Sequence, residues 1–181
     1  MWIGAAATLI VGLSMAIGDA EFFRGTTALE IGANIFFIAL AGMMFGVLSQ
    51  MFFFAYMTLN YIARDMFRRP TTWLLVQLFF IMTVPFEIYF FMWSGGLVEF
   101  IVGLSVILAA SVGVAYWKVR LTRSTAFLPT LFFMFVFTML ETAIALKVDD
   151  TFATLFMAVP LLACNAWQIL RLHKLVQKEE S

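Results

Sequence analysis

Two glutamates inside long apolar stretches are the residues of this sequence best suited to chemistry. Glu87 lies about 9 Å along a helix from Trp93, and Glu141 lies a similar distance from Lys147, at about 1.5 Å per residue. If these stretches cross a membrane, an ionised carboxylate at that depth costs about 3 kcal/mol or more. Each glutamate is therefore expected to face the protein interior, to be paired or to be protonated. Glu99, near the start of the next apolar stretch, is expected to reach the membrane interface.

These glutamates have two interpretations. In the first, Glu87 and Glu141 share a site for an ion, a proton or a polar ligand in the outer half of a helix bundle. In the second, each is a packing residue that is protonated or paired with an amide. No lysine, arginine or histidine lies deep in any apolar stretch, which argues against a charge relay between the glutamates and a buried cation.

Residue patterns of catalytic and metal sites are missing from the sequence. His173 is the only histidine and Cys164 the only cysteine, so there is no histidine cluster, no HExxH motif and no intramolecular disulfide. No predicted span contains an aspartate, which an intramembrane aspartyl mechanism would need, and glycine-rich phosphate loops are absent. We therefore expect a protein that is not an enzyme and that has no metal, no cofactor and no nucleic-acid partner.

The elements that must position the glutamates are transmembrane helices. Hydrophobic residues make up 64% of the 181 residues and charged residues 12%, and the mean hydropathy is +1.00, far from the composition of soluble domains. The apolar runs lack strand-like alternation, which favours helices over a barrel. We predict an all-α integral membrane protein, a single domain of six transmembrane helices in three helical hairpins. The predicted spans are residues 2–18, 32–62, 73–93, 97–117, 127–146 and 151–170.

The basic residues predict how the spans are oriented. Only Arg24 and Lys147 fall on one predicted side of the membrane. The other nine lysines and arginines fall on the opposite side: Arg64, Arg68, Arg69, Lys118, Arg120, Arg123, Arg171, Lys174 and Lys178. The positive-inside rule then places both termini in the cytoplasm and the chain in the plasma membrane as a multi-pass protein. Residues 1–18 could instead be a cleaved signal peptide, but they lack a basic segment, which favours a first span.

A face of small residues runs through the second predicted span. Gly42, Gly46 and Gln50 are spaced four residues apart, and Ser49 lies beside them. Glycines at this spacing allow two helices to approach closely, and an amide can then bond across the pair for about 0.6–2 kcal/mol. This face is therefore expected to contact another helix. The first span carries a similar ladder: Gly4, Thr8, Gly12 and Ala16.

Other polar residues of the spans are predicted at the membrane interface. Tyr56 and Asn60 lie toward the cytoplasmic end of the second span. Four further amides lie close enough to predicted span ends for their side chains to reach the interface: Asn34, Gln77, Asn165 and Gln168.

Part of the sequence resembles a known family. The run "GMMFGVLSQMFFFAYMTLN" is followed by a basic "RDMFRRP" loop, by "WLLVQL" and by "FEIYFF". Residues 42–91 are in this respect similar to the KbaA family, small polytopic membrane proteins of spore-forming Gram-positive bacteria that support signalling through the sensor kinase KinB. The most specific residues of the resemblance are Ser49, Gln50, Met51, Phe54, Ala55, Tyr56 and Thr58. The resemblance implies a non-enzymatic activator of a sporulation phosphorelay.

Two functional hypotheses follow for the chain. A membrane protein without a cytoplasmic domain can act on a KinB-like kinase by helix contacts within the bilayer, which shift the preferred conformation of the kinase. The residues expected to contact this partner are Gly42, Gly46, Ser49, Gln50 and Tyr56. The alternative is a small transporter, or a bundle that senses a solute or protons, built around Glu87 and Glu141. The oligomeric state is left open by both.

Overall fold

A computed structural model of the chain describes residues 2–18, 28–67, 69–93, 96–143 and 151–179, which form helices joined by short turns and contain no strand. The helices in chain order are α1 (Trp2–Gly18), α2 (Ala28–Met66), α3 (Pro70–Phe91), α4 (Leu97–Leu121), the 3₁₀ turn η1 (Ser124–Ala126), α5 (Phe127–Phe132), the π-helix η2 (Phe133–Phe137), α6 (Thr138–Thr142) and α7 (Thr151–Glu179). The all-helical fold class is thus confirmed.

Four helical segments are long and apolar enough to cross a membrane: Glu30–Met66, Pro70–Phe91, Leu97–Leu121 and Ser124–Thr142. Trp2–Leu13 and Phe156–Leu172 are shorter apolar helical stretches. Helices overlap all six predicted spans, while the number of six crossings and the cytoplasmic position of both termini stay predictions. The 39 residues of α2 extend about 58 Å, well beyond a hydrocarbon core of about 30 Å, so this helix must tilt or protrude.

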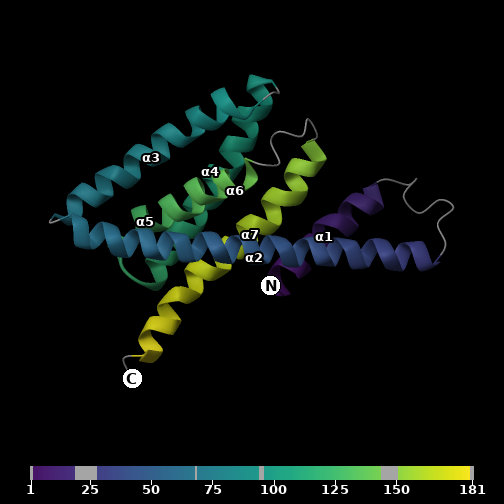
Figure 1. Cartoon of the computed structure of the whole chain (residues 1–181), viewed down its shortest axis with the longest axis horizontal. Helices are drawn as coiled ribbons and strands as arrows, with labels where there is room; N and C mark the ends of the chain where they lie inside the picture. Colours follow the sequence, from purple (N-terminus) through teal and green to yellow (C-terminus); the bar gives the residue numbers. More distant parts are fainter. Residues whose placement is uncertain (1, 19–27, 68, 94–95, 144–150, 180–181) are drawn as a thin grey trace.

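The helices form two groups that meet along α2 and α7 (Figure 1). In the first group, α1 packs against both α2 and α7, and α7 crosses α2. In the second, α3 and α4 pack against the continuous segment α5, η2 and α6. Contacts of α7 with α6, α4 and η2 join the groups. Pro70 begins α3, where its fixed backbone angle favours a helix start, and the Trp73 indole N–H donates to Asn60 Oδ1 of α2 at 2.9 Å.

The segment formed by α5, η2 and α6 is the centre of the molecule. In its most apolar stretch 61% of the residues are buried, against 17%, 22% and 11% for the three other long segments. Tyr56 of α2 packs its ring on Phe133, with centroids 4.9 Å apart, and its hydroxyl donates to the Pro129 carbonyl at 3.3 Å. Phe53 also packs edge-on against Phe133. Aromatic packing therefore fixes α2 against this central segment.

Gln77 is a buried amide in α3 and corrects the interface position predicted for it. Its side chain is fully buried on the face of α3 that also holds Trp73 and Ile81, and neither amide atom has a hydrogen-bond partner among the described residues. Leaving such a group without a partner costs about 1–3 kcal/mol. We therefore expect Gln77→Leu, which has similar volume, to raise the free energy of unfolding by about that amount.

The stabilisation can be measured as the midpoint of thermal unfolding in detergent. Gln77→Ala is the matched variant, because it removes the same amide but leaves a cavity, so its gain should be smaller. A lower midpoint for Gln77→Leu than for the unaltered chain would contradict the expectation.

Candidate functional site

A hydrogen-bonded cluster of four side chains joins three helices inside the protein. The Ser49 hydroxyl of α2 donates to Asn165 Oδ1 of α7 at 2.6 Å. Asn165 Nδ2 donates to two acceptors on α6, Thr138 Oγ1 at 3.0 Å and Glu141 Oε2 at 2.8 Å. Ser49, Thr138 and Asn165 are fully buried, and Glu141 is 4% exposed. We call these residues the Asn165 cluster.

The local sequence explains why α6 presents two of these groups together. Thr138 and Glu141 are three residues apart, so their side chains lie on one face of the helix. They follow the π-helix Phe133–Phe137, whose wider turn changes the direction in which the next residues point. The Thr142 hydroxyl of the same helix donates to the Thr138 carbonyl at 2.8 Å. The aromatic π segment and the polar cluster are therefore consecutive parts of one buried helix.

Only one of the two carboxyl oxygens of Glu141 is hydrogen-bonded in the Asn165 cluster. Glu141 Oε2 accepts from Asn165, whereas the buried Oε1 has no partner among the described residues. Hydrogen bonds between transmembrane helices contribute about 0.6–2 kcal/mol each, so the three contacts of Asn165 stabilise the packing of α2, α6 and α7. The expectation that Glu141 faces the protein interior and meets an amide agrees with this geometry.

The other two glutamates lie outside the cluster. Glu87 and Glu99 are both exposed. The buried face of α3 follows Ile81, Val84 and Ile88, and Glu87 lies off that face. The structure therefore does not place Glu87 in the interior or beside the buried Glu141, and the expectation that Glu87 is paired or protonated stays a prediction.

Asn165 is the main functional candidate that the sequence reasoning placed wrongly. The predicted span ends at residue 170, so Asn165 was expected to reach the interface, but α7 continues to Glu179 and places Asn165 at its midpoint. The signal that could have found it is the basic, partly apolar continuation "RLHKLVQK", which can extend the helix beyond the membrane.

The two predicted ladders of small residues meet each other within the chain. A Cβ atom added to Gly42 would lie 2.6 Å from Thr8 Oγ1 and 2.7 Å from the Gly4 carbonyl oxygen. A Cβ added to Gly4 would overlap the Gly42 carbonyl oxygen and lie 3.0 Å from the Gly46 amide nitrogen. These distances leave no room for a side chain, so the glycines allow α1 and α2 to touch backbone to backbone. The helix contact expected of this face is thus present, and the second helix is α1.

Most residues predicted to contact a partner are therefore covered by the chain itself. Gly42 and Gly46 face α1, Ser49 bonds to α7, and Tyr56 is 4% exposed beneath the central aromatic residues. They are not a free surface in this arrangement, and the partner contact expected of these four positions stays a prediction. Gln50 is the exposed member of the predicted set.

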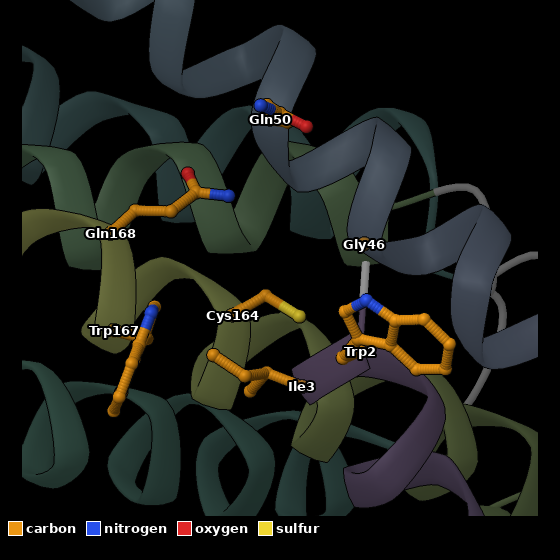
Figure 2. A pocket seen from close by; sticks show the side chains of 7 residues that line it. All are labelled: Trp2, Ile3, Gly46, Gln50, Cys164, Trp167 and Gln168. Atoms are coloured by element: carbon orange, nitrogen blue, oxygen red, sulfur yellow. The ribbon is translucent and has the colours of Figure 1, made fainter.

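Gln50 borders a pocket between α2, α7 and the start of α1. The pocket has a volume of about 290 Å³. It is lined by Trp2, Ile3, Gly46, Gln50, Cys164, Trp167 and Gln168. Figure 2 shows the side chains of Gln50 and Gln168 projecting from facing helices toward the same space. Gln168 Oε1 is buried without a partner among the described residues, so the pocket offers amide groups in an otherwise apolar wall.

No group of three or more histidine, cysteine, aspartate or glutamate side chains is assembled in the part of the chain that the structure describes. The candidate site consists of the buried Asn165 cluster and the neighbouring Gln50 pocket. Its groups are amides, hydroxyls and one carboxyl, which can hold helices together or bind a polar side chain.

Comparison with known proteins agrees with these features. No solved structure matches the chain. The chain is 36% identical over 183 residues to the "KinB-signaling pathway activation protein" of Bacillus subtilis (strain 168), covering 97% of this chain and 92% of that protein. The family model described as "KbaA: KinB-signalling pathway activation in sporulation" matches residues 4–175. The chain therefore belongs to the KbaA family, whose name indicates activation of the KinB signalling pathway in sporulation.

Proposed function

We propose that this chain is a non-enzymatic membrane protein that raises the output of a KinB-like sensor kinase through helix contacts within the bilayer. Its family supplies the pathway, and its four long apolar helices supply the means of contact. Binding that favours one conformation of the kinase shifts the kinase population toward that conformation. The kinase would in turn feed the sporulation phosphorelay.

The observation that carries this proposal is the environment of Gln50. Its amide lies near the middle of the segment Glu30–Met66, is exposed, and makes no hydrogen bond to any described residue. Neighbouring side chains are exposed and apolar, among them Val47 and Met51. An amide facing hydrocarbon without a partner is unfavourable, and a polar side chain on a second transmembrane helix would satisfy it. The adjoining pocket gives such a side chain room to enter.

We therefore expect Gln50→Leu to weaken the complex with the kinase by about threefold to thirtyfold, which corresponds to the loss of one interhelical hydrogen bond. The experiment is co-purification of the full chain with the membrane kinase from cells that express both, together with a reporter of kinase-dependent sporulation. Met51→Leu is the matched control, because it changes an exposed residue beside Gln50 without changing polarity.

The amount of membrane-inserted protein must be equal in all samples. Full complex formation and full output from Gln50→Leu would exclude Gln50 as the contact. If Met51→Leu also lost complex formation and output, α2 would tolerate no change at this position. The effect of Gln50→Leu could then not be assigned to the loss of a polar group.

The alternative function, a transporter or a bundle that senses a solute or protons, gains support only from Glu141. One oxygen of this buried carboxyl has no partner among the described residues, whereas Glu87 is exposed. The alternative requires the carboxyl group of Glu141 itself. The contact proposal requires only that position 141 accept the hydrogen bond of Asn165.

A further inference from the structure

A buried lysine joins the last turn of α4 to α7. Lys118 is 5% exposed, and its ammonium group donates to the Ile169 carbonyl oxygen at 2.6 Å. Lys118 lies at the end of the apolar segment Leu97–Leu121. The stem of this lysine is covered by its neighbours, and its ammonium group is bonded to the backbone of α7. The contact therefore sets the last turn of α4 and the Ile169 region of α7 at one level.

Two arginines lie on aromatic rings at this level. The Arg120 guanidinium of α4 lies over the Tyr116 ring at 4.7 Å from the centroid, and that of Arg171 lies over the Trp167 ring of α7 at 4.3 Å. Each arginine is two residues from the Lys118–Ile169 contact, which is about 3 Å along its helix. The sequence shows only two separate basic segments, and the Lys118–Ile169 contact sets both at one level of the helix pair, which we call the basic and aromatic rim.

The rim leaves the donor groups of both arginines available. A guanidinium group that lies over a ring can still use its remaining N–H groups to bind two oxygens of a phosphate. Arg120 uses one of them for the Tyr116 hydroxyl at 2.8 Å. Both arginines are exposed.

Negative side chains are missing around these cations. No aspartate or glutamate occurs in residues 100–140 or 151–178, which include all of the rim. Among the described residues, no ion pair involves Lys118, Arg120 or Arg171. Exposed aromatic side chains beside these cations, with Trp167 46% and Tyr116 55% exposed, are typical of the headgroup layer of a membrane.

We propose that this rim, formed by Arg120 with Tyr116 and by Arg171 with Trp167, binds the phosphate groups of anionic phospholipids. The surface shares Trp167 with the wall of the Gln50 pocket, but its two arginines are not among the residues that line that pocket. It requires neither the kinase contact nor the function proposed above. Its ligand is the bilayer lipid itself, held at the headgroup level by the two arginines that lie over aromatic rings.

The test uses the full chain in nanodiscs made from phosphatidylcholine with increasing fractions of phosphatidylglycerol. Native mass spectrometry of protein released from them gives the ratio of the two lipids that stay bound. The unaltered chain is expected to retain phosphatidylglycerol preferentially, and each arginine lost should lower this preference about fivefold. The variant Arg120→Gln/Arg171→Gln should thus lose about thirtyfold.

The matched control is Arg64→Gln/Arg69→Gln, which removes two exposed arginines from the ends of α2 and α3. It should lower the preference for phosphatidylglycerol by less than Arg120→Gln/Arg171→Gln does, because among the described residues neither Arg64 nor Arg69 lies over an aromatic ring. An equal loss in both double variants would show general charge attraction and would overturn the proposal, as would no preference in the unaltered chain. Inorganic phosphate added to discs of pure phosphatidylcholine should not raise the thermal midpoint of the protein. If inorganic phosphate raised this midpoint as much as phosphatidylglycerol does, a lipid ligand would be refuted.

Discussion

Gly42→Leu is expected to force α1 away from α2 and to abolish KinB-dependent output while the protein still inserts into the membrane. The new side chain would meet the Gly4 carbonyl and the Thr8 side chain at distances that permit no adjustment without moving a helix. Thr8 cannot easily turn away, because it is fully buried and its hydroxyl donates to the Gly4 carbonyl at 2.8 Å. Overpacking of this kind lowers the free energy of unfolding by about 1–3 kcal/mol. We expect a value near the upper limit, because the new side chain meets backbone atoms.

The matched control for this prediction is Gly32→Leu in the same helix. A Cβ at Gly32 has nothing within 4 Å, so the same substitution should leave both the thermal midpoint and the output near those of the unaltered chain. The measurements are thermal unfolding in detergent, membrane-inserted protein and a sporulation reporter. If Gly42→Leu behaved like Gly32→Leu, the close crossing of α1 and α2 would be refuted.

Asn165→Leu should produce the second large effect, a loss of about 2–4 kcal/mol in the free energy of unfolding. The substitution removes the donor to Thr138 and Glu141 and the acceptor for Ser49, and it leaves these buried groups without partners. The measurement is the thermal midpoint together with kinase-dependent output. A loss below about 0.5 kcal/mol would mean that the cluster contributes little to helix packing.

Glu141→Gln is the companion variant, because its amide oxygen can still accept from Asn165 Nδ2. It should lower the free energy of unfolding by less than about 1 kcal/mol and should retain output if the chain acts by contact. Exposed Glu87→Gln should change neither quantity. Loss of output from Glu141→Gln with unchanged stability would instead favour the solute-sensing or proton-sensing alternative, since that function needs the carboxyl group.

Glu87 and Glu141 show that a position along a helix does not predict whether a side chain is buried. Both lie about 9 Å from a predicted span end, so their positions along the sequence cannot distinguish them. Rotation about the helix axis separates them: Glu87 lies off the buried face of α3, whereas Glu141 points inward on α6 after the π-helix. A π-helix depends on packing around Phe133 and Phe137, which no local pattern predicts.

The small-residue faces illustrate the opposite case. Their four-residue spacing predicted that the faces around Gly4 and Gly42 would contact helices, because spacing alone decides which residues share a face. Spacing does not say which helix fills each face. In the structure these two faces contact each other, so the surface that was predicted to contact a partner forms the contact between α1 and α2.

The sequence by itself determined the helical class, the apolar character of the long helices and the two glycine faces. These are properties of composition and of residues within a few turns of each other. Only the tertiary structure decided that Ser49 bonds to Asn165, 116 residues away, and that Lys118 joins α4 to α7. The physical reason is that a buried polar group takes whichever partner the packed helices bring within about 3 Å, and that choice depends on helix rotation and crossing rather than on sequence distance.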